Sequence, residues 1–365
     1  MKKVISVAGA RPNFMKIAPI HRAFQKYSLH VEHLLVHTGQ HYDYNMSETF
    51  FNDFKLPKPN YFLNVGSGSH AEQTSKVMFE FEKVCLEVKP DLVIVVGDIN
   101  STIAAALTAV KMGIKVAHVE GGLRSFDRTM PEEINRLATD AICDYCFVTE
   151  ESAIINLKNE SFPEKNIFFT GNTMIDSLHF ALPEAKERKI YQNFNLDPKN
   201  YIIITLHRPS NVDEPEQLKS ILEILNEFSE IRKIVFPAHP RTHKNIEKFG
   251  LNQYIENKNI KFLQPLGYID FLSLMNESDF VVTDSGGIQE ETTAIGIPCV
   301  TIRTTTERPS TVDLGTNILI KPEPKIIKET LNKLINSTRK NATVPPLWDG
   351  KAAERIVKII VENIL

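Results

Sequence analysis

The sequence has few cysteines, no long hydrophobic run and no excess of charge of either sign. Its four cysteines in 365 residues do not form a disulfide framework, which indicates a reducing compartment. Apolar runs such as Leu92–Val96 are far shorter than the roughly 18 residues of a membrane span. Lys and Arg number 42 against 45 Asp and Glu, and no segment is densely basic. We therefore expect a cytoplasmic protein that binds neither membranes nor nucleic acid.

Cys143 and Cys146 form a C-x-x-C pattern, which can indicate zinc or redox chemistry. No second cysteine pair and no histidine lies at the spacing of a zinc site. The pair also lies where a predicted helix runs into an apolar strand. The pattern therefore favours buried structural thiols, and we predict no metal site.

The length of 365 residues corresponds to about two domains at roughly 150 residues each. Short β-branched runs alternate with longer amphipathic segments, a pattern typical of βα units and parallel sheets. The expected strands are Val4–Ala8, Val31–His37, Leu92–Gly97, Val116–Glu120, Cys146–Thr149 and Ile167–Thr170, then Tyr201–Leu206, Lys233–Ala238, Ile260–Gln264, Phe280–Thr283, Cys299–Ile302 and Asn317–Ile320. Six strands in each half predict an α/β fold of two Rossmann-like, doubly wound domains that face a central cleft.

The domain boundary is predicted near Gly171-Asn172, which separates an N-terminal domain, 1–171, from a C-terminal domain, 172–350. The tail, 351–365, has isoleucines at a helical period, namely Ile356, Ile359, Ile360 and Ile364. We expect this tail to form a helix whose apolar face packs against a domain surface.

Two segments after predicted strands suit a diphosphate. After the first strand, Arg11 and Lys16 place two cations beside a helix N-terminus. Solvated surface cations are the alternative interpretation. The segment is not G-x-G-x-x-G, so a dinucleotide fingerprint is missing and no nicotinamide cofactor is expected.

The second segment is DSGGIQEE, which follows the predicted strand Phe280–Thr283. Gly286 and Gly287 let the backbone approach a ligand, and the next helix presents free N–H groups to a phosphate. Glu291 lies where it can accept hydrogen bonds from a ribose. A capped helix with acids in its first turns explains the acidic residues but not the paired glycines. Ser285 lacks the G-x-S-x-G context of a hydrolase nucleophile.

Titratable residues gather at predicted strand ends and helix starts. The candidates for acid and base chemistry are Asp98, His118, Glu120, Glu132, Glu133 and His207. Each has an ordinary explanation as a helix cap, a first-turn acid or a half-buried imidazole. These ordinary explanations do not predict that all of these residues gather at the same edge of the sheets. Crowded carboxylates raise one another's pKa, which suits an acid and base pair.

The motifs together, in order, resemble those of the non-hydrolysing UDP-N-acetylglucosamine (UDP-GlcNAc) 2-epimerases. They are GARPNFMKIAP, HTGQHYD, GDINST, HVEGGLRSFDRTMPEEINR, TLHRPSN, PAHPRT, TDSGGIQEE, TTTERP and DGKAAERIV. The resemblance implies a B-type glycosyltransferase architecture in which the C-terminal helix crosses back onto the first domain. It also implies a homodimer that acts on a UDP-sugar for polysaccharide biosynthesis.

The resemblance also implies residue roles. Those near the UDP moiety are Arg11, Lys16, Phe271, Ser285, Gly286, Gly287, Glu291 and Arg308; those in the acid, base and substrate set are Asp98, Glu120, Glu132 and His207; and those at a possible effector site are Gln40 and His41. Pro209 and Ser210 depart from the charged pair of many bacterial members, and Leu266 stands where Gln is frequent. These departures affect regulation and nucleotide contacts rather than the reaction.

The implied reaction eliminates UDP across C1 and C2 of the sugar to give 2-acetamidoglucal, then adds UDP back after protonation on the opposite face. It needs a base at C2 and cations on the leaving diphosphate, and the sequence has both. The alternatives are a hydrolysing 2-epimerase, an epimerase of a 2,3-diacetamido uronic acid nucleotide, a glycosyltransferase and a nucleotide-sugar sensor. The retained carboxylates argue against a sensor. The sequence does not assign which carboxylate is the base.

Overall fold

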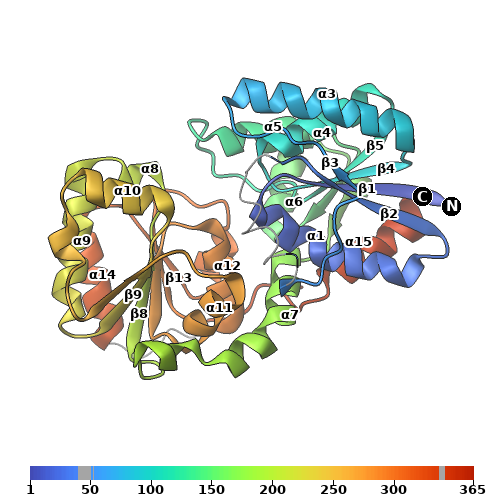
Figure 1. Cartoon of the computed structure of the whole chain (residues 1–365). Coiled ribbons are helices and arrows are strands. Elements are labelled where there is room, and N and C mark those ends of the chain that lie inside the picture. The colour runs from blue at the N-terminus through green and yellow to red at the C-terminus, as the bar shows by residue number, and fades with distance from the viewer. Residues whose placement is uncertain (40–50, 52, 337–341) are drawn as a thin grey trace. The chain divides into compact units, whose positions relative to one another are not determined.

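The computed structural model describes residues 1–39, 51, 53–336 and 342–365. The chain forms two compact units, each with a parallel sheet (Figure 1). Unit 1 consists of Met1–Phe180 and Pro346–Leu365, and unit 2 consists of Ala181–Pro345. The predicted boundary near Gly171-Asn172 falls just before helix α7 (Thr173–Arg188), and the contacts divide the chain inside α7. Two doubly wound parallel-sheet domains confirm the predicted fold class.

The sheet of unit 1 has the strand order β3-β2-β1-β4-β5-β6-β7. Its strands are β1 (Lys2–Ala8), β2 (Val31–His37), β3 (Tyr61–Phe62), β4 (Leu92–Val96), β5 (Lys115–Val119), β6 (Tyr145–Val148) and β7 (Ile167–Phe169). Six strands were predicted here, so β3 is a correction. It has only two residues, too few for an alternating pattern to be visible in the sequence.

Helices cover both faces of this sheet, which explains why β4 is an unbroken run of five buried apolar residues. The helices are α1 (Arg11–Phe24), α3 (His70–Val88), α4 (Asn100–Lys111), α5 (Pro131–Ile142), α6 (Glu151–Asn159) and α15 (Ala352–Ile359), with short helical turns at Gln25–Tyr27, Glu164–Asn166 and Ile360–Ile364. α3, α4 and α5 lie on one face, and α1 and α15 lie on the other (Figure 1). No helix in the described part of the chain is long and apolar enough to cross a membrane.

The sheet of unit 2 has the order β10-β9-β8-β11-β12-β13. Its elements are β8 (Tyr201–Thr205), β9 (Lys233–Pro237), β10 (Ile260–Leu263), β11 (Phe280–Thr283), β12 (Cys299–Ile302) and β13 (Asn317–Ile320), with α8 (Pro209–Val212), α9 (Pro215–Ser229), α10 (Pro240–Lys248), α11 (Tyr268–Glu277), α12 (Gly286–Ile295), α13 (Pro309–Asp313), α14 (Pro324–Asn336) and turns at Ile190–Phe194 and Asn252–Tyr254. All six strands predicted in this half are present. β11, β12 and β13 have the predicted bounds, and β8, β9 and β10 end one residue earlier.

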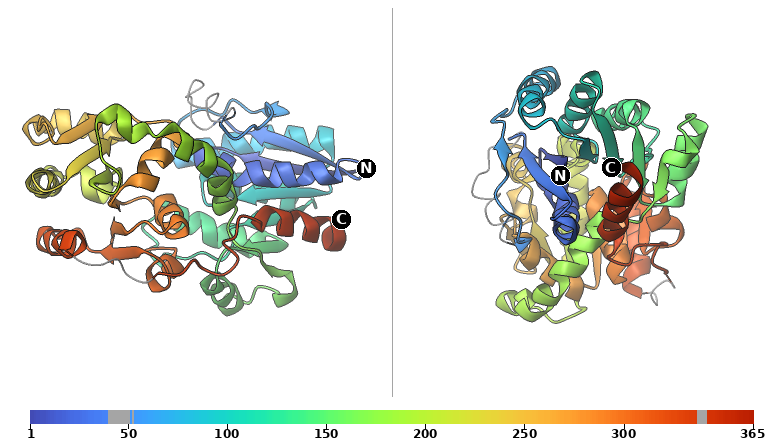
Figure 2. Two further views of the ribbon diagram at one scale, coloured as in Figure 1. Left: turned by 90° about the horizontal axis from the view of Figure 1, so that it is seen from below. Right: turned by 90° about the vertical axis from the view of Figure 1, so that its right-hand side faces the viewer.

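The C-terminal segment packs on unit 1, where α15 lies beside α1 (Figure 2). Trp348 is buried, and its indole N–H donates to the carbonyl oxygen of Thr149 at 2.9 Å. The N-terminal end of α15 is held by Asp176, whose carboxylate accepts from the backbone N–H of Ala352 at 3.1 Å and of Ala353 at 2.7 Å. One buried side chain therefore anchors the helix to the body of the unit.

Asp176 makes the stability of unit 1 depend on pH. Burial raises the pKa of this carboxyl to about 6, against an ordinary value of 3.8, although the two backbone N–H groups oppose the shift. Folding therefore favours the protonated form, and the free energy of unfolding falls as the pH rises through the folded pKa. We expect the unfolding free energy of the wild type minus that of Asp176→Asn to fall by about 1 kcal/mol between pH 5 and pH 7.5. Urea unfolding of both proteins at both pH values measures this difference in unfolding free energy. A difference that does not change with pH would contradict the raised pKa of Asp176.

Candidate active site

The carboxyl ends of β4 and β5 bring Asp98 and Glu120 to the same edge of the unit 1 sheet, because these parallel strands are neighbours. Lys16 of α1 reaches the same edge, and its Nζ lies 2.5 Å from Glu120 Oε2. Gly97 makes this approach possible, since a Cβ at that position would lie 2.9 Å from Lys16 Nζ. A carboxylate and an ammonium are thus paired beside the end of a central strand.

Glu120 is unusual in both its backbone and its side chain. Its φ of 69° lies in the left-handed region, which is costly for a residue with a side chain. Its Oε2 faces Lys16, whereas Oε1 is buried with no hydrogen-bond partner among the described residues. A buried carboxylate oxygen without a donor destabilises the folded state. Backbone strain and an unsatisfied carboxylate oxygen occur together in Glu120, which indicates that the protein holds this side chain in place for a ligand.

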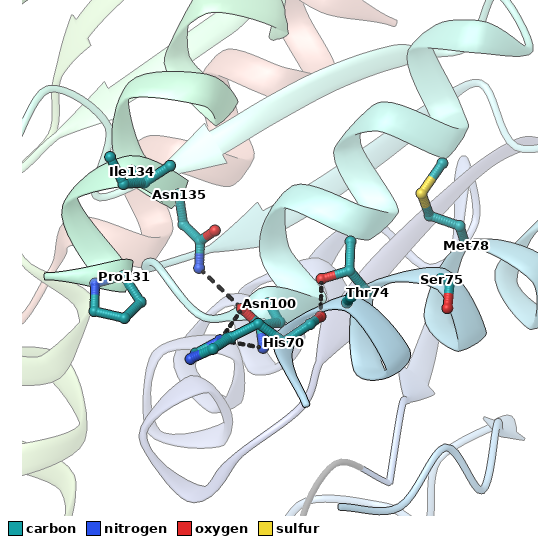
Figure 3. Close-up of a pocket in the computed structure, with 9 residues that line it drawn as sticks. His70, Thr74, Ser75, Met78, Asn100, Pro131, Ile134 and Asn135 are labelled. Carbon is teal, nitrogen blue, oxygen red and sulfur yellow. Dashed lines mark hydrogen bonds between the residues drawn. The ribbon is translucent and has the colours of Figure 1, made fainter. Parts of the chain in front are cut away.

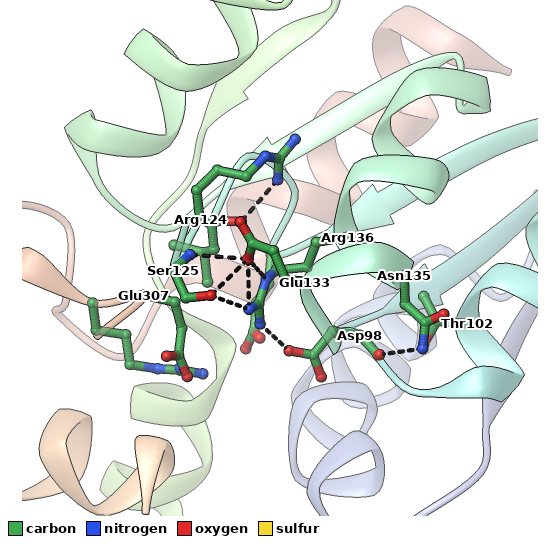
Figure 4. A network of polar contacts seen from close by, with 12 residues as sticks. Asp98, Thr102, Arg124, Ser125, Glu133, Asn135, Arg136 and Glu307 are labelled. Carbon is green, nitrogen blue, oxygen red and sulfur yellow. Dashed lines mark hydrogen bonds and ion pairs between the residues drawn. The ribbon is translucent and has the colours of Figure 1, made fainter. Parts of the chain in front are cut away.

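Asp98 is linked to a buried ion-pair network (Figure 4). Arg136 contacts Asp98 Oδ2 through Nη1, and its Nη2 lies 2.8 Å from Glu133 Oε2. Glu133 also accepts from the backbone N–H of Ser125 at 2.9 Å and of Phe126 at 3.0 Å. Burial raises the pKa of Glu133, but the hydrogen bonds from Ser125 and Arg136 outweigh it and lower the pKa below its usual value. Glu133 is therefore an anchor, and Asp98 is the half-exposed end of the network.

Glu132 precedes Glu133 in the first turn of α5 and has different surroundings. It is partly exposed, and its carboxylate makes no hydrogen bond or ion pair with any described residue. The structure therefore separates two adjacent acids: Glu133 is held in the protein, and Glu132 is open to a ligand.

His118 and Arg124 hold the chain in place at the ends of β4 and β5 through buried contacts. His118 Nδ1 lies 2.6 Å from Asp140 Oδ1, and its Nε2 lies 2.8 Å from the carbonyl oxygen of Gly97. Arg124 Nη2 lies 2.7 Å from Asp140 Oδ2. All three side chains are buried. They fix the backbone next to Asp98 and present no nitrogen to a ligand.

Cys143 and Cys146 are buried and unbridged, in agreement with the predicted structural thiols, and their sulfurs lie 3.4 Å apart. Together with Asp140 they form a group whose donor atoms lie within 4.8 Å of one another. Both oxygens of Asp140 already contact His118 and Arg124. The positive charge of Arg124 so close to Asp140 would repel a metal ion bound there. The group is therefore better suited to supporting the sheet than to binding metal.

In unit 2, the neighbouring strands β8 and β11 bring His207 and Asp284 together. His207 Nδ1 lies 2.9 Å from Asp284 Oδ1. Asp284 is fully buried, and it also accepts from the backbone N–H of Arg208 at 2.9 Å and from the amide of Asn211 at 3.0 Å. The sequence analysis did not assign Asp284 a role at the site.

The glycine pair starts α12 as expected, and Ser285 is its N-cap. A Cβ on Gly286 would lie 2.8 Å from Arg308 Nη1, so the glycine leaves room for this guanidinium. Arg308 is buried, its Nε lies 2.7 Å from Glu290 Oε1, and its Nη1 contacts Glu307. Two carboxylates thus hold Arg308 beside the helix N-terminus, and its contact with a nucleotide stays a prediction.

Glu291 is buried, and its Oε1 accepts a hydrogen bond from the Tyr268 hydroxyl at 2.8 Å. Tyr268 starts α11, and the partly buried Phe271 follows one turn later on the same helix. The predicted ribose and uracil residues are therefore linked through Tyr268, which the sequence analysis missed. Its position after a predicted strand was the only available signal.

A pocket of about 490 Å³ opens in unit 1 beside the Asp98 network (Figure 3). Its lining residues are His70, Ala71, Thr74, Ser75, Met78, Asn100, Pro131, Ile134 and Asn135. The Asn135 amide donates to the carbonyl oxygen of Asp98 at 2.9 Å, which connects the pocket to the candidate acids. The volume lies in the range of small-molecule sites.

Three predicted residues have no described side chain. Arg11 is the first residue of α1, and nothing is described of its side chain. Gln40 and His41, the predicted effector residues, lie outside the described residues. Their roles stay predictions.

The two parallel sheets define an α/β protein of two Rossmann-like domains, which is the architecture of the B-type glycosyltransferases. A family model described as UDP-N-acetylglucosamine 2-epimerase matches residues 22–361. The chain belongs to this family, which confirms the resemblance of the motifs.

Full-length relatives agree with this assignment. The UDP-N-acetylglucosamine 2-epimerase of Methanocaldococcus jannaschii is 44% identical and covers 98% of each chain. The crystal structure of the M. jannaschii enzyme in complex with UDP-GlcNAc and UDP matches with a TM-score of 0.90 over 99% of each chain. The UDP-2,3-diacetamido-2,3-dideoxy-D-glucuronate 2-epimerase of Pseudomonas aeruginosa is 40% identical over 92% of this chain and 93% of its own.

Proposed function

We propose that this protein is a non-hydrolysing UDP-GlcNAc 2-epimerase, an isomerase that interconverts UDP-GlcNAc and UDP-N-acetylmannosamine (UDP-ManNAc). The observation that carries the proposal is the state of Glu120. One of its carboxylate oxygens is paired with Lys16, and the other is buried without a partner among the described residues. Binding alone does not need such a group, whereas proton transfer at a sugar carbon does.

In the proposed reaction, a carboxylate removes the proton from C2 while the bond between C1 and the UDP oxygen breaks. The electron pair of the C–H bond forms the C1–C2 double bond of 2-acetamidoglucal, and the pair of the C–O bond leaves with UDP. A second group then protonates C2 on the opposite face, and UDP adds back to C1. Asp98, Glu120, Glu132 and His207 are the proposed acid, base and substrate-contacting groups, and no cofactor takes part.

The UDP moiety is assigned mainly to unit 2. Ser285, Gly286 and Gly287 place the N-terminus of α12 at the carboxyl end of β11, where its free N–H groups favour a phosphate. Glu291 and Phe271 are proposed for the ribose and the uracil, and Arg308 for the nucleotide. Arg11 and Lys16 of unit 1 are proposed for the diphosphate, although Lys16 is also the ion-pair partner of Glu120.

The test is incubation of the purified protein with UDP-GlcNAc alone, followed by identification of all products. We expect UDP-ManNAc with the total of UDP-sugars nearly conserved. Free N-acetylmannosamine with equimolar UDP would instead show a hydrolysing 2-epimerase. Recovery of unchanged UDP-GlcNAc would contradict the proposal.

A second candidate substrate is a UDP-2,3-diacetamido uronic acid. The observation that favours it is the P. aeruginosa relative, which is nearly as similar as the UDP-GlcNAc 2-epimerases. The motif TTTERP favours the unmodified sugar, since it resembles the corresponding motif of UDP-GlcNAc 2-epimerases. Measuring kcat/KM for both substrates in parallel distinguishes them.

The assembly and location of the protein are also proposals. The family resemblance supports a homodimer and a role in supplying a precursor for polysaccharide synthesis. The four free, buried cysteines support a cytoplasmic location, because reduced thiols are usual there.

A further inference from the structure

His207 and Asp284 form an imidazole–carboxylate pair that leaves part of the His207 side chain accessible. Asp284 is fully buried, while about a third of the His207 side chain, 35%, is exposed. The carboxylate receives the backbone N–H of His207 on both oxygens, at 3.1 Å and 3.0 Å. Arg208 and Asn211 donate to the same Oδ2. Three N–H groups besides the imidazole therefore fix Asp284 in one orientation.

This geometry determines which nitrogen of the neutral His207 ring carries the proton. Burial raises the pKa of Asp284, but the hydrogen bonds from His207, Asn211 and Arg208 outweigh it, and the pKa lies below its ordinary value. An ionised carboxylate only accepts hydrogen bonds, so Nδ1 at 2.9 Å must be the donor. The lone pair of the neutral ring then lies on Nε2.

His118 of unit 1 shows the contrasting arrangement. It also pairs with a buried aspartate, Asp140, but its Nε2 faces the carbonyl oxygen of Gly97. Both of its nitrogens are thus committed to acceptors inside the protein. At His207, the carboxylate engages only Nδ1, and the exposed part of the ring is left for a ligand.

We propose that Asp284 is a positioning residue that holds His207 with its proton on Nδ1, so that Nε2 is the nitrogen presented to the substrate. The inference rests on the proposed function, in which His207 contacts the reacting sugar nucleotide. Asp284 itself contacts no substrate. It acts by fixing the tautomer and the orientation of the ring, as second carboxylates do in other imidazole sites.

The test is Asp284→Asn, which keeps the shape of the side chain. The N–H groups of His207, Arg208 and Asn211 all point to the Oδ2 position, so the amide oxygen is expected there. The amide NH₂ then takes the Oδ1 position and donates to His207 Nδ1, which moves the ring proton to Nε2. We expect kcat to fall by about 10²- to 10³-fold, with a much smaller change in KM.

The tautomer is measured directly by ¹⁵N NMR of protein labelled at histidine, with the His207 signals assigned by their loss in His207→Gln. We expect a protonated Nδ1 in the wild type and a protonated Nε2 in Asp284→Asn. Asp279→Asn is the matched control. It lies at the opposite end of β11, where its carboxylate is 3.5 Å from Arg232, and we expect it to keep kcat within about twofold and the wild-type tautomer.

Two results would overturn the proposal: an unchanged kcat in Asp284→Asn, or a reduced kcat with the proton still on Nδ1, which would make Asp284 a structural residue only. Failure of the proposed function gives a different result. The wild type would then leave UDP-GlcNAc unchanged, while the NMR comparison would still determine whether Asp284 sets the His207 tautomer.

Discussion

Replacing Glu120 by Gln is expected to lower kcat by about 10²- to 10⁴-fold, because the amide has nearly the same volume but cannot transfer a proton. The expected loss of activity rests on Glu120 Oε1, because this buried oxygen has no partner among the described residues and is left to accept a proton. The amide oxygen can still accept a hydrogen bond from the Lys16 ammonium, so the fold should persist. We expect the same direction and range for Glu132→Gln, since this acid is open to a ligand.

The measurement is the steady-state rate of UDP-ManNAc formation, together with UDP affinity by titration calorimetry. Glu151→Gln is the matched control, because Glu151 is an exposed acid in the first turn of α6. It should retain the wild-type rate, and all variants should retain UDP affinity. Loss of the buried charge opposite Lys16 also makes thermal unfolding a necessary check on Glu120→Gln. Near-normal rates in both active-site variants would rule out the carboxylate mechanism.

In deuterated water, UDP-ManNAc formed by this protein should carry deuterium at C2. The base releases the C2 proton to solvent before a second group delivers one to the opposite face of the sugar. Proton NMR of the product should therefore show almost complete loss of the C2 signal. Prolonged incubation should also release some UDP and 2-acetamidoglucal, whenever the intermediate escapes before re-addition.

Two controls accompany the isotope experiment. Heat-inactivated protein should leave the C2 hydrogen in place, and Glu120→Gln should form deuterated UDP-ManNAc at its own reduced rate. Exhaustive dialysis should not change the activity, since no nicotinamide takes part. Product that keeps its original hydrogen at C2 would exclude elimination and favour an internal hydride transfer.

The strands other than β3 were predictable because they are short runs rich in β-branched and other apolar residues, bounded by turn signals. β4 shows this best, since all five of its residues are apolar and buried. The carboxyl ends of β4, β5 and β8 were therefore predictable as well, which placed Asp98, Glu120 and His207. The two-residue strand β3 has no such pattern and was missed.

The partners of these residues were not predictable from local sequence. Asp284 reaches His207 only because β11 lies beside β8, and strand order is a property of the whole sheet. Lys16 and Glu120 are 104 positions apart in the chain, and they meet because helix α1 reaches across to the end of β5 at the same edge of the sheet. Glu132 and Glu133 are neighbours about 100° apart around a helix, so one side chain is buried and the other is partly exposed. Because the two residues are chemically identical, the sequence does not show which of them is buried.

The return of the last segment, Pro346–Leu365, to unit 1 has a consequence for biosynthesis. Unit 2 is continuous in sequence, whereas unit 1 is built from both ends of the chain. The side chains of Ile356, Val357 and Ile360 are fully buried in the folded protein, so the surface of unit 1 that they cover stays exposed until this segment has been synthesised. Domains generally fold in the order in which they are synthesised. In this protein the order of completion is reversed: unit 1 is begun first, but it can finish folding only after all of unit 2 and the segment that follows it have been synthesised.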